Sequence, residues 1–351
     1  KDYESISTEL IKTVPSYVIG LSNVNIRIVN EIKRHGVLID SIAEEMASGI
    51  SSGGDKIFRI STEKSEELHI EKEILHKVLV GAEIDNYLIN DKNYVIIYTT
   101  KDIDIYKYDN IYKYLLPYQV KLSGKRETVK GILPWWCLHW PRYKGLFEEP
   151  KIIMRQTSDS IRCVYDENGY YVLNSILVLK LNNQDYSYKY LATVLNSTCI
   201  DFLYKNLTQE EGRTFAEVKP ANVRKLYIPR ATKEQQNLLS ILYDYLAFLK
   251  NPKQPKPFIS LNSMFIDLFE KIVDGCVYEL FFKEHMKERE IDIMYYLYQK
   301  IIPIDGLSDE EKNNTIISVH SSIFMTDNPV RTRLKLFVLR SQEFLKPIIQ
   351  H

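Results

Sequence analysis

Residues 150–181 read PKIIMRQTSDSIRCVYDENGYYVLNSILVLKL and contain four runs rich in isoleucine, valine, leucine and tyrosine. Such runs, bounded by polar and turn-forming residues, are typical of β-strands. Asn168-Gly169, which tolerates positive φ, predicts a hairpin turn between the second and third runs. The predicted strands are 151–155, 161–165, 170–173 and 176–181.

Sequence on either side of this stretch adds helices and further strands. We expect helix in two pieces over 2–35, ending before Gly36, a helix over 110–122 interrupted at Pro117, and one helix over 186–205. Short strands are expected at 57–60, 94–98 and 224–228. From Thr232, which forms a capping box with Gln235, the pattern becomes helical, apart from an exposed proline-rich connector over 251–257. Further helical segments are expected at 261–287, 289–302, 308–324 and 329–347. The fold class is therefore α+β, a mixed β-sheet region followed by an α-helical C-terminal domain.

Length and composition limit the possible classes of protein. A chain of 351 residues suggests roughly two domains, and 45% hydrophobic with 26% charged residues excludes wholesale disorder. The net charge is zero, which excludes a uniformly basic surface but allows a local basic face. Four widely spaced cysteines indicate reduced thiols, and hence a cytoplasmic protein. No run suits a membrane helix, and the first residues are not a signal peptide; we expect them to lie inside a longer protein.

Charge is distributed unevenly along the first half. Residues 62–110 carry a net charge of −5, and residues 111–163 carry +6 together with all three tryptophans, Trp135, Trp136 and Trp140. Cations neutralise phosphates, arginine reads guanine edges, and aromatic rings stack on bases, so the second window is a candidate nucleic-acid surface. The alternative is that the tryptophans belong to the core and the charges to a solvated rim. For one of Trp135 and Trp136 the core is favoured, because adjacent strand residues point in opposite directions.

Motifs for catalysis are missing from the sequence. It has no GxGxxG, P-loop or HxxxH pattern, and no Pro-Pro pair, so the Asn/Asp-Pro-Pro-aromatic motif of amino-methyltransferases is absent. The glycine-rich stretch 48–56 allows close backbone approach to a phosphate, but an ordinary surface turn is an equal alternative. A binding module without a metal site is expected.

Six short motifs in a consistent order carry a family resemblance over roughly residues 20–230. They are GISSGGDKIF at 49–58, LVGAEIDNY at 79–87, LLPY through LSGKR at 115–126, WWCLHWPR at 135–142, PKII at 150–153 and LNS at 195–197. This pattern resembles the TaqI-like C-terminal specificity domain, which supplies target recognition in adenine-N6 DNA methyltransferases and single-chain type II restriction-modification enzymes.

The resemblance implies a helical linker over 1–47, a mixed β-sheet target-recognition domain over 48–231 and a helical C-terminal domain over 232–351. It implies double-stranded DNA as partner, with or without a flipped adenine, and an N-terminal methyltransferase domain of the same protein, in which alone S-adenosylmethionine would bind. The parent enzyme could also carry a nuclease, while this part is expected to be non-catalytic. A protein-interaction scaffold whose helical half docks a partner subunit is the alternative.

The candidate DNA-contacting residues combine the glycine-rich loop with the basic and aromatic side chains of the second window. They are Ser52, Gly53, Gly54, Lys56, Lys121, Lys125, Arg126, His139, Trp140, Arg142, Tyr143 and Arg155.

Overall fold

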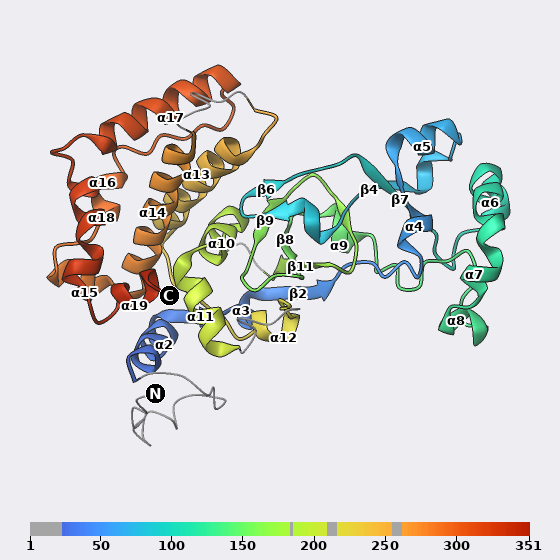
Figure 1. The fold of residues 1–351 in the computed structure, drawn as a ribbon, viewed down its shortest axis with the longest axis horizontal. Coiled ribbons are helices and arrows are strands. Elements are labelled where there is room, and N and C mark those ends of the chain that lie inside the picture. Colours follow the sequence, from blue (N-terminus) through green and yellow to red (C-terminus); the bar gives the residue numbers. More distant parts are fainter. Residues whose placement is uncertain (1–22, 183–184, 209–215, 255–261) are drawn as a thin grey trace.

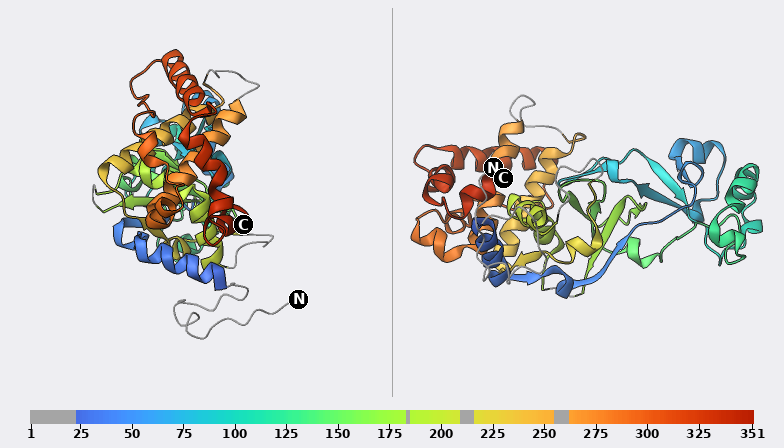
Figure 2. Two further views of the ribbon diagram at one scale, coloured as in Figure 1. Left: turned by 90° about the vertical axis from the view of Figure 1, so that its left-hand side faces the viewer. Right: turned by 60° about the horizontal axis from the view of Figure 1, so that its bottom comes forward.

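The elongated molecule has helices at one end, a β-sheet in the middle and a smaller lobe at the other end (Figure 1). This computed structural model describes residues 23–182, 185–208, 216–254 and 262–351. A second orientation shows the same sequence of parts along the long axis (Figure 2). The α+β class is confirmed, with several small sheets in the first half and a mostly helical C-terminal portion.

The central sheet is antiparallel and has the order β2-β11-β8-β9. Its strands are β2 (Ala43–Ser48), β8 (Lys151–Arg155), β9 (Cys163–Asp166) and β11 (Ile176–Leu181). All six residues of β11 are buried, which explains why this run is apolar at every position except Lys180 rather than alternating. The helices α10 (Tyr188–Leu195) and α11 (Thr198–Leu207) follow β11.

The predicted hairpin between the second and third runs is wrong. Gly169 does adopt a positive φ of 72°, but β10 (Tyr171–Val172) leaves the central sheet and pairs in parallel with β4 (Leu75–Leu79). The buried Asp166 carboxylate accepts hydrogen bonds from the backbone N–H groups of Asn168 (2.9 Å) and Tyr170 (3.1 Å). These bonds hold the turn after β9, and the chain then continues to the second sheet.

The second four-stranded sheet has the order β10-β4-β7-β3 and forms the base of what we call the distal lobe, residues 52–79 and 94–144. Its other strands are β3 (Arg59–Ser61) and β7 (Tyr94–Ile97). The lobe's helices are α4 (Asp55–Phe58), α5 (Thr62–Glu67), η1 (Lys72–Ile74), η3 (Ile105–Lys107), α6 (Asp109–Leu115), η4 (Leu116–Tyr118), α7 (Gln119–Ser123) and α8 (Arg126–Val129). The strand predicted at 94–98 and the interruption at Pro117 are confirmed, but β3 starts only at Arg59 because residues 55–58 form a helical turn.

Several small elements join the central sheet to its neighbours. They are α2 (Asn23–His35), β1 (Gly36–Leu38), α3 (Ile39–Ile42), η2 (Gly81–Glu83), β5 (Ile84–Asp85), β6 (Leu88–Ile89), α9 (Gly145–Glu148), α12 (Pro220–Val223) and β12 (Tyr227–Pro229). Helix α2 ends where predicted, and the earlier helical piece lies largely outside the described residues. Gly36 begins β1, where a Cβ would come within 2.7 Å of the Tyr227 Cβ, so close packing requires the glycine.

The helical half contains α13 (Lys233–Lys250), α14 (Asn262–Phe281), α15 (Lys283–Glu288), α16 (Met294–Leu297), α17 (Asp309–Phe324), α18 (Pro329–Arg340) and α19 (Leu345–Ile349). The capping box of Thr232 and Gln235 is confirmed. The helix predicted over 289–302 is mostly wrong, since only α16 forms there. Residues 251–254 of the predicted connector lie outside any helix, and 255–257 lie outside the described residues.

The helical half is joined closely to the central sheet. The Tyr243 hydroxyl of α13 accepts a hydrogen bond from the Tyr165 N–H of β9 (2.8 Å), and Asp274 of α14 accepts one from the Thr198 N–H (2.8 Å). The single helix predicted over 186–205 is wrong, because the chain breaks at Asn196 and the Ser197 hydroxyl caps α11.

Candidate nucleic-acid interface

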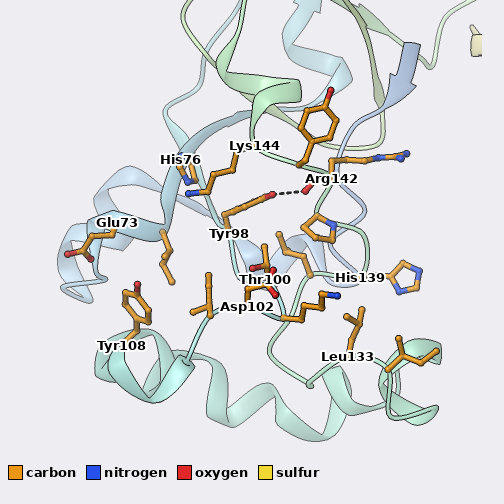
Figure 3. Close-up of a pocket in the computed structure, with 17 residues that line it drawn as sticks. Glu73, His76, Tyr98, Thr100, Asp102, Tyr108, Leu133, His139, Arg142 and Lys144 are labelled. Atoms are coloured by element: carbon orange, nitrogen blue, oxygen red, sulfur yellow. Dashed lines mark hydrogen bonds between the residues drawn. The ribbon is translucent and has the colours of Figure 1, made fainter. Parts of the chain in front are cut away.

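A cleft of about 730 Å³ opens in the distal lobe between the second sheet and the segment 132–144 (Figure 3). Figure 3 labels side chains from η1, from β4 and from the segments after β7 that meet around it. Its lining is Glu73, Ile74, His76, Tyr98, Thr100, Lys101, Asp102, Ile103, Tyr108, Ile132, Leu133, Leu138, His139, Pro141, Arg142, Tyr143 and Lys144. Three of the predicted DNA-contacting residues, His139, Arg142 and Tyr143, therefore share one cleft.

The glycine-rich loop supports this cleft from behind. Ser51 and Trp140 exchange two backbone hydrogen bonds (3.1 and 2.7 Å), and the His139 N–H donates to the Ser52 carbonyl (3.2 Å). Ser52 is buried, and its hydroxyl accepts a hydrogen bond from the Gly54 N–H (3.0 Å). Gly53 has a φ of 72°, and a Cβ there would lie 2.6 Å from the Lys125 Cδ. The loop is thus packed against the wall of the cleft rather than forming an isolated surface turn.

The structure corrects the prediction that Lys125 contacts DNA. Its side chain is buried, and its ammonium group donates hydrogen bonds to the carbonyls of Trp135 (3.0 Å) and Cys137. Burial lowers the pKa of Lys125 to about 8. A buried ammonium with two carbonyl partners holds the 135–137 segment in place instead of contacting a phosphate.

His139 connects the cleft wall to α8. Its Nδ1 lies 2.7 Å from the Glu127 carboxylate, and both side chains are partly buried. The Arg126 Nε is 4.0 Å from the same carboxylate, and the Arg126 side chain is 76% exposed. Glu127 is therefore engaged mainly by His139, and Arg126 projects into solvent.

Arg142 occupies a strained backbone position at the rim. Its φ is 60°, a left-handed conformation that is unfavourable for a residue with a side chain. The Arg142 carbonyl accepts a hydrogen bond from the Tyr98 hydroxyl (2.7 Å), and its guanidinium lies 4.9 Å from the centre of the Trp140 ring. Trp140 is 59% exposed, so an arginine–tryptophan pair faces solvent beside the cleft.

Sequence reasoning did not identify the residues that line the inner part of the cleft. His76 of β4 stacks on Tyr171 with ring centres 4.1 Å apart, and burial together with the Lys144 charge lowers its pKa. Burial raises the pKa of Tyr98 to about 12. The positive charge in the cleft comes from Lys101, Arg142 and Lys144. His76 and Tyr98 lie far along the chain from 139–144, so no local spacing could have revealed them.

Of the remaining predicted residues, Tyr143 lines the cleft, whereas Lys56, Lys121 and Arg155 lie outside its lining. Tyr143 is exposed, and its hydroxyl donates to Glu45, which raises the pKa of Tyr143 to about 12. Lys56 and Lys121 are exposed on α4 and α7, outside the cleft lining. Arg155 ends β8, where its Nε donates to the Thr157 carbonyl (2.8 Å), and it does not line the cleft.

Trp135 and Trp136 are only partly exposed and pack against the hydrophobic core. Their rings meet edge to face with centres 5.8 Å apart, and they also contact Tyr112 and Tyr106 respectively. The core interpretation is therefore confirmed for this pair, and Trp140 alone of the three tryptophans is strongly exposed.

Two general features limit the chemistry of the described residues. They contain no cluster of three metal-ligating side chains. Among the residues that the structure describes, every helix is too short or too polar to cross a lipid bilayer.

Comparisons with known proteins show a family match for part of the chain and similarity to solved structures. A search of curated proteins found no match. Two solved structures are similar at 11% identity: the type IIL restriction-modification enzyme MmeI in complex with DNA (TM-score 0.48, 73% of this chain and 35% of that one) and the type IIG restriction endonuclease BpuSI (TM-score 0.41, 75% and 34%). The chain thus spans about a third of the length of each.

Residues 76–228 match the model of the TaqI-like C-terminal specificity domain. The matched range begins on β4, so it includes the cleft residues from His76 onward and extends through the central sheet to β12, while the glycine-rich motif at 49–58 precedes it. The predicted resemblance to the TaqI-like C-terminal specificity domain is confirmed over this range.

Proposed function

We propose that this chain binds double-stranded DNA and reads its sequence with the cleft and rim of the distal lobe. The observation that carries the proposal is that Arg142 and Lys144 line the cleft and the exposed Trp140 ring lies beside Arg142, within the range that matches the TaqI-like specificity domain. A guanidinium can donate two parallel hydrogen bonds to guanine or to a phosphate, and an exposed indole offers a stacking or shape contact. Exposed cations outside the cleft, Lys56, Lys121 and Arg126, would contact the DNA backbone.

In this proposal the chain is the recognition part of an adenine-N6 DNA methyltransferase or fused restriction-modification enzyme. S-adenosylmethionine would bind in the methyltransferase domain of that enzyme, which would act on an adenine flipped from the duplex. We assign no transfer step to this chain. Incubating it with DNA and labelled S-adenosylmethionine should transfer no label, and transfer by this chain alone would contradict the assignment.

The proposal is tested by selecting bound duplexes from a pool with a randomised central segment. The chain should enrich a defined sequence, and its affinity should fall with salt at about −0.9 in the log–log slope for each neutralised phosphate. Arg142→Ala should weaken binding about ten-fold or more while the melting temperature stays nearly unchanged. Lys335→Ala, which removes an exposed cation from α18 in the helical half, is the matched control and should bind like the wild type.

Failure to enrich any sequence, together with salt-independent binding, would overturn the proposal. Arg142→Ala with lowered stability but unchanged affinity per folded molecule would remove Arg142 from the interface.

The helical half supports a second candidate function, docking of a partner subunit. Large apolar side chains are strongly exposed there: Tyr295 (70%), Leu339 (68%) and Met325 (63%). Such surfaces mark protein interaction sites when they form contiguous patches. A chain that binds no DNA but forms a stable complex through these residues would favour the scaffold function over the recognition function.

A further inference from the structure

We propose that the turn Val129–Ile132 is an apolar wedge that inserts at a base step of the bound duplex and unstacks it. The inference rests on the proposed function, because it names how the same surface deforms its DNA. Val129 is 72% exposed and Ile132 is 62% exposed, and Ile132 also lines the mouth of the cleft. Two β-branched apolar side chains therefore project where the recognition surface meets solvent.

The charged residues around this turn favour DNA as its binding partner. Arg126 begins α8 with a 76% exposed side chain, Lys130 is exposed between the two apolar residues, and Lys121 is exposed on α7. The nearest acid, Glu127, is engaged by His139 at 2.7 Å. Cations on both sides would hold the phosphates that flank a base step, while an apolar side chain takes the place of stacked base surface.

A wedge has to be rigid to keep bases apart, and the turn is braced from within. The N–H groups of Val129, Gly131 and Ile132 donate to the carbonyls of Lys125, Thr128 and Glu127 respectively, each at 2.9 Å. Gly131 adopts a φ of 69°, which allows the chain to reverse immediately before Ile132.

The base of the turn is braced a second time by one buried and one partly buried polar contact. The Lys125 ammonium joins the start of α8 to the carbonyls of Trp135 and Cys137, and the Glu127–His139 pair joins the same helix to the cleft wall. Lys125 and the Glu127–His139 pair therefore position the wedge.

The experiment uses the full chain and the duplex obtained by selection, compared with duplexes that carry one mismatched pair at successive positions. A mismatch weakens stacking, so a mismatch at the inserted step should raise wild-type affinity about ten-fold. Duplexes labelled at both ends should also show a shorter end-to-end distance by energy transfer when bound. Ile132→Ser combined with Val129→Ser should lose both effects, whereas Ile132→Leu should keep them.

Val120→Ser is the matched control, because Val120 is 90% exposed on α7 but does not line the cleft. If the serine variant keeps the mismatch preference and the bend, or weakens binding to all duplexes equally, the wedge is overturned while the proposed function stands. If the wild-type chain binds no duplex at all, the proposed function itself fails.

Discussion

Lys151 in the central sheet and Lys125 in the distal lobe are both buried, but their ammonium groups have different hydrogen-bond partners. Lys151 is completely buried on β8, where its ammonium lies 2.6 Å from the equally buried Asp166 carboxylate. Lys125 in the distal lobe has only carbonyl partners. Burial lowers the pKa of both lysines, although Asp166 opposes the shift at Lys151.

The difference shows how the two regions use charge. The Lys151–Asp166 pair is neutral overall, so it fixes β8, β9 and the following turn without adding net charge to the sheet. The Lys125 charge has no countercharge among its hydrogen-bond partners and lies directly behind the cleft, beside Gly53 and His139. It therefore adds positive charge behind the proposed recognition surface without contacting a ligand directly.

The largest effect is expected from Asp166→Ala in the central sheet. It leaves the Lys151 ammonium buried without its countercharge and removes the acceptor for the Asn168 and Tyr170 N–H groups. We expect the free energy of unfolding to fall by about 3–5 kcal/mol, measured by urea denaturation. Asp159→Ala, at an exposed acid before β9, is the control. A loss below about 1 kcal/mol would mean that the pair is not structurally important.

A smaller loss is expected from Lys125→Met in the distal lobe. The methionine side chain replaces the apolar stem of the lysine, but the carbonyls of Trp135 and Cys137 lose their hydrogen-bond donor. The free energy of unfolding should therefore fall by about 1–3 kcal/mol. DNA affinity at low salt should fall as well, because the buried charge behind the cleft is gone. If stability falls and affinity per folded molecule does not, Lys125 only holds the 135–137 segment in place. The inference that its charge contributes to DNA binding would then be wrong.

The pH dependence of stability should differ between the wild type and Lys125→Met. The pKa of Lys125 is about 8 in the folded state, below the ordinary value of 10.5, so between these values the unfolded chain binds more protons. Wild-type stability should therefore rise relative to Lys125→Met as the pH increases from about 8 to 10, by up to about 1 kcal/mol per pH unit. Parallel stability curves for the two proteins would contradict a lowered pKa at Lys125.

The smallest effect on stability is expected from Arg126→Ala, because this side chain is exposed and its nearest carboxylate is 4.0 Å away. Unfolding should change by less than about 0.5 kcal/mol. The log–log salt slope of DNA binding should flatten by about 0.9 if Arg126 contacts a phosphate. A selective loss of about 1–3 kcal/mol for one DNA sequence would instead indicate that it reads a base.

Local signals explain what could be predicted from the sequence. The apolar run of β11 and the capping box at Thr232 depend on neighbouring residues, and both are present as predicted. The destination of β10 depends on pairing with β4, almost a hundred residues earlier, and no pattern within 161–173 specifies it.

The site could be predicted only in part for the same reason. His139, Arg142 and Tyr143 are close in sequence and share the cleft, whereas His76 and Tyr98 reach it from other strands. Lys125 resembles any surface lysine in sequence, and its burial results from the 135–137 segment folding over it.

The points at which the chain leaves and re-enters the central sheet determine how the proposed DNA specificity could be exchanged between related proteins. The chain leaves after β2 at Ser48, opposite Leu177 of β11, and returns on β8 at Lys151, three residues further along β11 on its other side, so the two points are about 14 Å apart. Residues 49–150 therefore form a cassette whose ends are fixed by one strand. A recombined cassette would keep the host sheet intact if it also preserves the β4 edge that receives Tyr171 and Val172.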